Sequence, residues 1–319
     1  MYLIAIDGGG TKTDLVLFEH DGTVRCKITG SASCPTSLGL DASFTTTAKL
    51  ICRLIKKAGV STDDIFALYA GIAGCGVASI GNAYTEKLQA EFRKIPFISC
   101  GSDVLSALNC GLSNDNGMAL ICGTGSSLLV RSGNNLHQVG GWGYLLGDEG
   151  SGYDFGRMGL KAALEAYDGR GRQTMLSQML KDALGMPVHN SIDKIYEGGK
   201  RLISSFAPIV LHAAAQGDTV ATDILNQATN KLCKMLIAGS HYIERPKYRT
   251  VLVGGIWNAE NNLLQNSLQE RLTEDFELIR PQQPPVYGAA VQALRISGLS
   301  LPVNFSEKFS TSLYSLPKG

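Results

Sequence analysis

The chain begins with short apolar runs separated by polar, glycine-rich turns. Residues 4–6 and 15–18 are apolar, and the stretch DGGGTKTD lies between them. The Asp21-Gly22 pair after the second run is typical of a two-residue hairpin, and a third run follows at residues 24–28. The pattern predicts strand, glycine turn, strand, hairpin and strand. It does not fit a P-loop, which needs a glycine directly before the lysine, or a dinucleotide fingerprint, whose glycines open a helix.

Helices and strands alternate in the next part of the chain. Apolar residues at helical spacing predict a helix over residues 42–58. The stretch DIFALYAGIAGCG at residues 64–76 is typical of a buried strand that runs into a glycine loop, residues 82–92 favour a helix, and residues 96–99 favour a further strand. Asp103 follows that strand, at the start of a short predicted helix.

The same order of elements starts again near residue 117. An apolar run at 118–122, the turn Gly123-Thr124-Gly125-Ser126, a second run at 128–131 and the turn SGNN repeat the order of residues 2–28. Chance similarity of two hairpins is the alternative. We favour a duplicated domain, because the two copies are much further apart than the repeats of a solenoid.

The second half of the chain is largely helical. Residues 153–184 and 192–242 have helical spacing, interrupted by proline and glycine. A third buried strand then leads into Gly254-Gly255, and we expect a helix to start near Asn258.

Composition narrows the class of protein. A chain of 319 residues is long enough for two domains, and 29 basic against 28 acidic residues leave no charge excess to bind nucleic acid or an anionic membrane. No apolar run reaches the roughly 18 residues needed to cross a bilayer, and the first run is too short for a signal peptide. The eight cysteines never form C-x-x-C, so we expect reduced thiols and a cytoplasmic location.

The three glycine turns, each after a buried strand, resemble the phosphate-1, phosphate-2 and adenosine motifs of the superfamily of actin, heat-shock chaperones and sugar kinases. Within it, GGWGYLLGDEGSGYDFGRMGL at residues 140–160, together with Ser102-Asp103 and the GTGS turn, resembles the N-acetylglucosamine kinase family. The resemblance extends to about residue 296. It implies an α/β fold of two ribonuclease-H-like (actin-like ATPase) domains with a central cleft for ATP and sugar.

The resemblance also implies a division of the chain into domains. The N-terminal domain carries the phosphate-1 hairpin and the catalytic aspartate, and the C-terminal domain carries phosphate-2, the sugar loop and the adenosine motif. The last helix is expected to pack back on the N-terminal domain, and the tail to be loosely ordered. The expected ranges are 1–115 and 116–300 for the domains, 286–298 for the last helix and 301–319 for the tail.

The implied activity is an ATP-dependent kinase that phosphorylates the 6-hydroxyl of an amino sugar, with N-acetylglucosamine favoured and Mg²⁺ as cofactor. Glucosamine or N-acetylmuramic acid are alternative substrates. Two further alternatives are a non-kinase ATPase like the activators of acyl-CoA dehydratases, which hold an iron–sulfur cluster through cysteines at a dimer seam, and a sugar-responsive binding protein without catalysis. A small sugar is the expected partner, and a homodimer is possible.

The resemblance assigns roles to particular residues. Asp103 is the expected general base, and Asp7 the expected Mg²⁺ ligand through water. The residues implied in sugar binding are Asp103, Ser126, Ser127, Gly141, Trp142, Gly143 and Asp148, with weaker indications for Cys34 and Thr36. The residues implied in ATP binding are Gly9, Gly10, Thr11, Thr124, Gly125, Ala214, Gly254, Gly255 and Asn258, with a weaker indication for Lys12.

Several of these residues have simpler interpretations. Asp103 could be only the N-cap of its helix, Asp7 could cap the turn, Lys12 could point to solvent, and Trp142 could be a core residue. Cys34 departs from the family pattern, which usually has a sugar-binding asparagine at this place. A thiol cannot donate and accept as an amide does, so the preferred amino sugar stays open.

Overall fold

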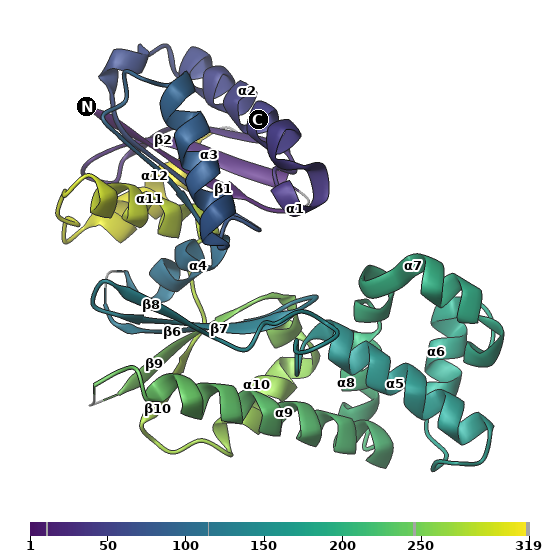
Figure 1. Ribbon diagram of the computed structural model, residues 1–319. Coiled ribbons are helices and arrows are strands. Elements are labelled where there is room, and N and C mark those ends of the chain that lie inside the picture. The colour runs from purple at the N-terminus through teal and green to yellow at the C-terminus, as the bar shows by residue number, and fades with distance from the viewer. Residues whose placement is uncertain (11, 114, 245–246, 317–319) are drawn as a thin grey trace. The chain divides into compact units, whose positions relative to one another are not determined.

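The computed structural model describes residues 1–10, 12–113, 115–244 and 247–316. The chain divides into two compact units, each built on one five-stranded sheet (Figure 1). The first unit contains Met1–Asn114 and Pro281–Gly319, and the second contains Asp115–Arg280.

The sheet of the first unit has the strand order β3-β2-β1-β4-β5. The central strand β1 pairs antiparallel with β2 and parallel with β4, and β4 pairs parallel with β5. This confirms the predicted opening strands and the glycine turn between the first two. The strands are β1 (Tyr2–Gly8), β2 (Lys12–Glu19), β3 (Val24–Ser31), β4 (Ile65–Ile72) and β5 (Phe97–Gly101).

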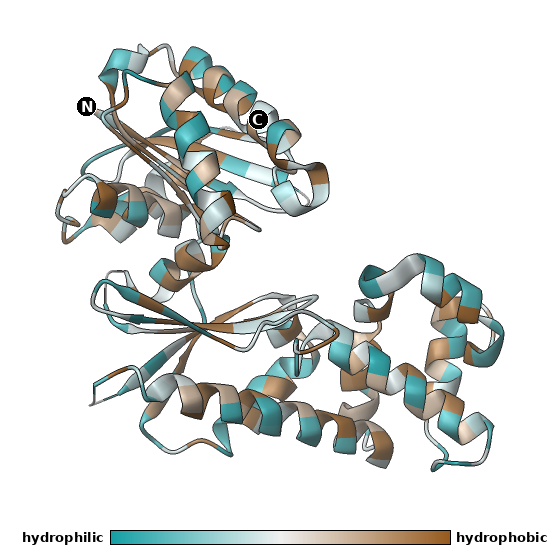
Figure 2. Cartoon of the chain, in the orientation of Figure 1, coloured by the Kyte–Doolittle hydropathy of each residue, from teal (hydrophilic) through white to brown (hydrophobic). Residues whose placement is uncertain are grey.

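Both faces of this sheet are covered, because successive side chains of a strand point to opposite faces. Ile4 and Ile6 of β1 pack with α2 and α3, whereas Leu3 and Ala5 pack with α11 and α12. The strands of this sheet are predominantly apolar (Figure 2). The helices of the first unit are α1 (Pro35–Leu38), α2 (Leu40–Ala58), η1 (Thr62–Asp64), α3 (Ala78–Glu91), α4 (Asp103–Leu112), α11 (Pro285–Ile296) and α12 (Phe305–Ser315).

The end of the chain differs from the expected loose tail. Residues 305–315 form helix α12, which buries Phe305, Phe309 and Leu313 against the first sheet. The ring of Phe309 lies 6.1 Å from that of Phe18 and 5.3 Å from that of Tyr287. The segment is rich in serine, but three of its apolar residues have helical spacing. These three side chains become buried only because they pack on a face of the first sheet. The expectation for residues 317–319 lies outside the described residues.

The second sheet repeats the topology of the first, with the order β10-β9-β6-β7-β8. Here β6 is central: it pairs antiparallel with β7 and parallel with β9, and β10 pairs parallel with β9. The predicted duplication is confirmed, and it extends from the hairpin to the two parallel strands. The strands are β6 (Gly117–Cys122), β7 (Ser126–Ser132), β8 (Asn135–Val139), β9 (Tyr248–Val253) and β10 (Phe276–Ile279).

Helices of the second unit form one core with this sheet, centred on buried residues such as Phe155, Leu232 and Trp257. They are α5 (Gly152–Tyr167), α6 (Leu176–Leu184), η2 (Val188–Asn190), α7 (Ile192–Ser204), α8 (Ala207–Ala215), α9 (Thr219–Ser240), η3 (Gly255–Asn258), η4 (Glu260–Asn262) and α10 (Leu263–Gln269). In the described parts of the chain, no helix has the length and apolar character to span a bilayer.

The helix expected near Asn258 starts later than predicted. Two short 3₁₀ turns come first, and the α-helix begins at Leu263. Asn261 and Asn262 have φ of 53° and 66°, in the left-handed region that asparagine tolerates better than most residues. These two residues interrupt the helical path that the apolar spacing favours.

Phe309→Ala should destabilise the first unit by about 3–5 kcal/mol, because it leaves a cavity among buried aromatic rings. Urea unfolding of the full chain measures this. Tyr314→Ala is the matched control, since Tyr314 lies in the same helix but is 72% exposed, and its effect should stay within about 0.5 kcal/mol. Equal effects of the two substitutions would mean that α12 does not pack as described.

Candidate functional site

The turn after β1 brings backbone groups close together. The amide of Gly9 donates to the carbonyl of Lys12 at 2.9 Å, and the amide of Ala73 donates to the carbonyl of Gly8 at 2.8 Å. A side chain at Gly8 would collide with the hydroxyl of Ser33, whereas Gly10 has open space around it. The turn therefore leaves free room beside Gly10, as a phosphate-binding turn requires. Thr11, the predicted hydroxyl donor of this turn, lies outside the described residues.

Two carboxylates meet beside this turn. Asp7 lies near the end of β1, and Asp103 begins α4 just after β5. Burial, and then the charges of Asp103 and Asp14, raise the pKa of Asp7 to about 7, although Lys12 lowers it. Burial also raises the pKa of Asp103, against hydrogen bonds from Ser102 and backbone amides. Two buried carboxylates of like charge favour a cation or a proton between them.

The N-cap of α4 is Ser102 rather than Asp103. The hydroxyl of Ser102 accepts a hydrogen bond from the amide of Val104 at 3.1 Å, and Asp103 is the first helical residue. The hydroxyl of Ser102 also contacts Asp103 Oδ1 at 3.3 Å. The simpler interpretation of Asp103 as the cap residue of α4 is therefore wrong.

Lys12 pairs with its own strand. Its ammonium lies 2.6 Å from Asp14 Oδ2, and its side chain is 64% exposed. Burial acts to raise the pKa of Asp14, but hydrogen bonds from Lys12 and Thr29 outweigh it and lower the pKa. The carboxylate of Asp7 differs, since no hydrogen bond or ion pair of this side chain is found among the described residues.

Cys34 is the N-cap residue of the short helix α1, and Thr36 lies within that helix. Cys34 is buried and its sulfur lies 3.0 Å from the hydroxyl of Thr36, which is itself exposed. A side chain at Gly74 would come within 2.9 Å of Thr36 and 3.6 Å of Cys34. The two residues are therefore packed against the loop after β4, and the thiol already has a polar neighbour.

The glycine turn of the second unit is bonded to the start of α5. The amide of Gly123 donates to the carbonyl of Gly125 at 2.9 Å, and the amide of Gly152 donates to the carbonyl of Gly123 at 2.8 Å. Thr124 is exposed at the tip of the turn. Ser126 is buried, and its hydroxyl donates to the carbonyl of Glu149 at 2.6 Å. It thereby holds in place the segment around residues 141–150, which is the predicted sugar loop and is called the sugar loop below.

Asp148 is buried in an unusual backbone conformation. Its φ of 60° lies in the left-handed region, which is costly for a residue other than glycine or asparagine and often marks a functional site. The carboxylate accepts the amide of Ser126 at 3.3 Å and the ammonium of Lys200 at 2.7 Å. These contacts fix the position of the carboxylate next to the Gly123–Ser126 turn.

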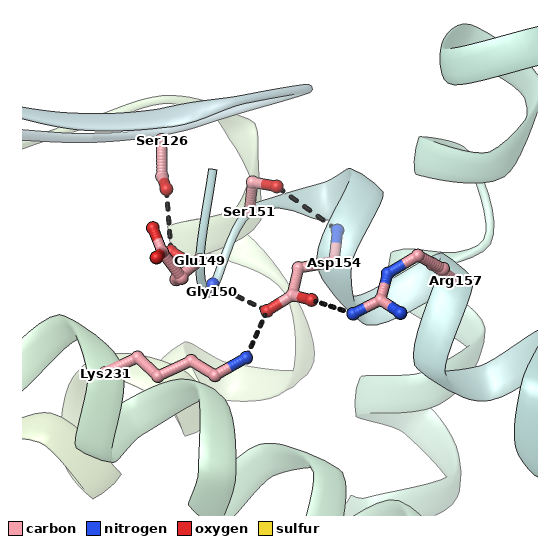
Figure 3. A network of polar contacts seen from close by, with 7 residues as sticks. All are labelled: Ser126, Glu149, Gly150, Ser151, Asp154, Arg157 and Lys231. Atoms are coloured by element: carbon pink, nitrogen blue, oxygen red, sulfur yellow. Dashed lines mark hydrogen bonds and ion pairs between the residues drawn. The ribbon is translucent and has the colours of Figure 1, made fainter. Parts of the chain in front are cut away.

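A second carboxylate anchors the end of the same loop (Figure 3). Asp154 accepts the amide of Gly150 at 3.0 Å and pairs with Arg157 at 2.9 Å and Lys231 at 3.2 Å. Burial acts to raise the pKa of Asp154, but these bonds outweigh it and lower the pKa. The amide of Asp154 also donates to Ser151, the N-cap of α5. The loop is therefore tethered at both ends of its acidic segment.

The glycines before Asp148 allow tight turns and expose the tryptophan. Gly141 and Gly143 have φ of 74° and 86°, and a side chain at Gly141 would collide with Ser127. Trp142 is 67% exposed, so its interpretation as a core residue is wrong. Tyr144, Leu145 and Leu146 are exposed as well. The loop thus presents large apolar side chains to its surroundings.

The predicted adenosine residues gather around β9 and α8. Gly254 has a φ of 114°, and a side chain there would collide with the carbonyl of Cys122. Gly255 begins η3 and has open space around it. Asn258 is exposed and its amide oxygen accepts from Arg280 at 2.7 Å.

Ala214 lies on α8, and a contact between α8 and η4 brings it toward the same region. His212 Nδ1 of α8 lies 3.0 Å from Glu260 Oε1. This pair joins α8, which carries Ala214, to η4, which begins two residues after Asn258.

The structure adds residues that sequence reasoning missed. Lys200 and Lys231 reach the acidic segment of the sugar loop from 52 and 77 residues away. The only local signal was Gly198-Gly199 before Lys200, and Gly199 indeed interrupts α7 with a φ of 52°. Contacts at such separations cannot be read from local spacing.

Two five-stranded sheets of identical topology, each with a glycine turn after its central strand, define the actin-like ATPase class of fold and confirm the predicted fold class. Within this class, a model of the BadF/BadG/BcrA/BcrD ATPase family matches residues 4–293. The chain belongs to that family.

Relatives with known names support the resemblance to N-acetylglucosamine kinases. The chain is 30% identical to an N-acetylmuramic acid/N-acetylglucosamine kinase of Clostridium acetobutylicum, covering 92% of this chain and 98% of the relative. It is 30% identical to an N-acetyl-D-glucosamine kinase of Dictyostelium discoideum, covering 91% and 97%. A solved structure from Chromobacterium violaceum, provisionally assigned as an N-acetylglucosamine kinase, is 25% identical, covers 92% and 98%, and has a TM-score of 0.71.

The pKa of Asp7 predicts an unusual pH dependence of stability. Its pKa rises from 3.8 to about 7 on folding, so the unfolded chain releases this proton first as the pH rises. The free energy of unfolding therefore falls between about pH 4 and pH 7, by up to roughly 4 kcal/mol. Asp7→Asn should be more stable than the wild type at about pH 8 without divalent cations, and the difference should vanish near pH 4.

Urea unfolding in the presence of a chelator measures this effect. Asp14→Asn is the matched control of opposite sign, because the pKa of Asp14 is lowered and its ionised form stabilises the fold above about pH 4. A wild type that equals or exceeds Asp7→Asn in stability at the higher pH would contradict the repulsion between Asp7 and its neighbours.

Proposed function

We propose that the chain is an ATP-dependent kinase that transfers the γ-phosphoryl group of ATP to the 6-hydroxyl of an amino sugar. N-acetylglucosamine is the favoured substrate. The observation that carries the proposal is the meeting of Asp7 and Asp103 beside the Gly8–Lys12 turn, in a member of an ATPase family whose named relatives are amino sugar kinases. ATP use follows from the family.

Asp103 acts as the general base in this proposal. The sugar oxygen attacks the γ-phosphorus, the bond from that phosphorus to the ADP oxygen breaks, and Asp103 accepts the hydroxyl proton. Burial that raises the pKa of Asp103 supports the role, because a base works best when its pKa approaches the working pH. Most of the rate enhancement of phosphoryl transfer comes from positioning and charge neutralisation.

The phosphates of ATP are bound in this proposal by the glycine turns of both units, through Gly9, Gly10, Thr11 and Lys12 and through Thr124 and Gly125. Gly254, Gly255, Asn258 and Ala214 contact the adenosine. Asp7 suits Mg²⁺, because a hard cation prefers carboxylate oxygen, and burial and the like charges of Asp103 and Asp14 make a bare charge on Asp7 unfavourable. The ion would neutralise phosphate charge. No group of three or more His, Cys, Asp or Glu side chains that could hold a metal occurs in the described ranges, so phosphate and water would supply the other ligands.

The sugar is bound in this proposal by Asp148, whose carboxylate accepts neighbouring hydroxyls, and by the loop from Gly141 to Gly143. Ser126 and Ser127 belong to the same proposal, with Cys34 and Thr36 as weaker contacts. The assignment of functional domains to residues 1–115 and 116–300 is part of it as well. The proposal also includes a cytoplasmic location and a homodimer. The eight free cysteines support the cytoplasmic location.

The alternative of a dehydratase activator is supported by the family but not by the cysteines. An iron–sulfur cluster at a seam between two subunits needs accessible thiolates. Among the eight cysteines, Cys52 is exposed and Cys110 partly exposed, whereas the others are buried. Iron in the purified protein, together with no turnover on any amino sugar, would favour the activator over the kinase.

Asp103→Asn should lower kcat by at least about a hundredfold while leaving the fold intact, because it removes the general base but not the helix cap at Ser102. Coupled detection of ADP measures turnover, and thermal unfolding checks the fold. Asp41→Asn is the control, since Asp41 also lies in the first turn of a helix of the first unit but is exposed. Turnover retained in Asp103→Asn would refute the assignment.

The loop with Cys34 predicts how the sugar preference can be changed. Cys34→Asn supplies the amide that the family usually has here, so it should raise kcat/KM for N-acetylglucosamine relative to glucosamine, by roughly fivefold for one added hydrogen bond. A panel of N-acetylglucosamine, glucosamine, N-acetylmuramic acid and glucose measures the ratios. If the ratio does not change, this loop does not contact the N-acetyl group.

A further inference from the structure

A pocket of about 540 Å³ lies between α5 and α7 in the second unit. This volume is in the range of sites for small organic ligands. Its wall is built from aliphatic and aromatic side chains, including Leu160, Ile195 and Tyr196. The lip is also apolar, since Tyr196 is 83% exposed and Ile192 is 38% exposed. Large apolar side chains left in solvent around a concave site are typical of a binding surface.

The charged side chains that line this pocket are all cationic. The lining includes the cations Arg157, Lys161, Arg170 and Lys200, and none of the lining residues that the structure describes is acidic. Each cation forms an ion pair with a carboxylate that does not line the pocket: Asp154, Glu165, Asp168 and Asp148. A guanidinium has five N–H donors and an ammonium three, so each retains donors for a further anion.

These features select a chemical class of ligand. A neutral sugar needs hydrogen-bond acceptors such as carboxylates or amides, and this wall offers apolar carbon, phenol groups and cations. An apolar ligand without charge would not use the cations. We propose that the pocket binds a small amphipathic organic anion, with an aromatic or branched apolar body and one carboxylate, sulfonate or phosphate group.

The pocket is connected to the sugar loop at two points. Lys200 lies 2.7 Å from Asp148, directly after the kink at Gly199, and its ammonium lies 5.6 Å from the ring of Tyr144. Arg157 lies 2.9 Å from Asp154, which holds the amide of Gly150. An anion that draws Lys200 or Arg157 toward itself weakens their hold on the loop. On the proposed function of Asp148 in sugar binding, occupancy of the pocket therefore opposes binding of the sugar.

Binding is tested with anilinonaphthalene sulfonate, a fluorescent amphipathic anion, on the folded full chain. We expect saturable binding that weakens by roughly fivefold in Tyr196→Ala and in Lys161→Glu, each of which removes about 1 kcal/mol of contact. Both residues are exposed, so neither change threatens the fold. The matched controls, Tyr314→Ala and Lys234→Glu, alter exposed residues outside the pocket and should bind as the wild type does.

Equal binding by all four variants would overturn the pocket as the site. So would displacement of the probe by ATP without any effect of Tyr196→Ala, because the probe would then occupy the nucleotide site. Loss of probe binding on dimer formation, followed by sedimentation, would also overturn it, by showing that a second copy covers Tyr196.

The connection to the sugar loop is tested by turnover. Saturating anilinonaphthalene sulfonate should raise the KM for the sugar about fivefold, at the low end of coupling between sites, and the effect should weaken in Tyr196→Ala. An unchanged KM at saturation would refute the connection. If no amino sugar is phosphorylated at all, the proposed function fails, while the fluorescence experiment still decides whether the pocket binds the anion.

Discussion

The central strand of each sheet must satisfy hydrogen bonds on both edges and bury side chains on both faces. In β1, residues from Leu3 to Ile6 are fully buried, and in β6 the same holds for Met118 to Leu120. Polar groups are excluded along such a strand and can gather only where it ends. In both units the chain leaves this strand through a glycine turn, so backbone amides and carboxylates collect at that edge of the sheet. The candidate site is a consequence of this constraint.

The two units use carboxylates at this edge in opposite ways. In the first unit, burial raises the pKa values of Asp7 and Asp103, and the charge of Asp103 raises that of Asp7 further. In the second unit, Asp148 is paired with Lys200, and Asp154 with Arg157 and Lys231. The pair of carboxylates in the first unit suits proton transfer and metal binding, since a bound proton or a metal ion relieves the repulsion between the two charges. The second unit suits recognition of hydroxyls by a carboxylate held in a fixed orientation.

The sugar loop carries strain that its tethers hold in place. Asp148 has a left-handed backbone conformation, and Ser126, Asp154 and Lys200 restrain the residues around it. Because the tethers come from α7 and α9 as well as from the glycine turn, a change in the helices can reach the carboxylate. This arrangement relates the loop to the pocket between α5 and α7 by direct contacts rather than by distance alone.

The sequence by itself determined the hairpins, the duplication, the glycine turns and the candidates Asp7, Asp103 and Asp148, because apolar periodicity, turn chemistry and motif spacing are local properties. Tertiary structure alone decided four points. It made Ser102 the cap of α4, exposed Trp142, ordered α12 on the first sheet, and brought Lys200 and Lys231 to the sugar loop. Each depends on which surfaces meet after the chain has folded, and charge pairing or burial between distant residues leaves no pattern in the local sequence.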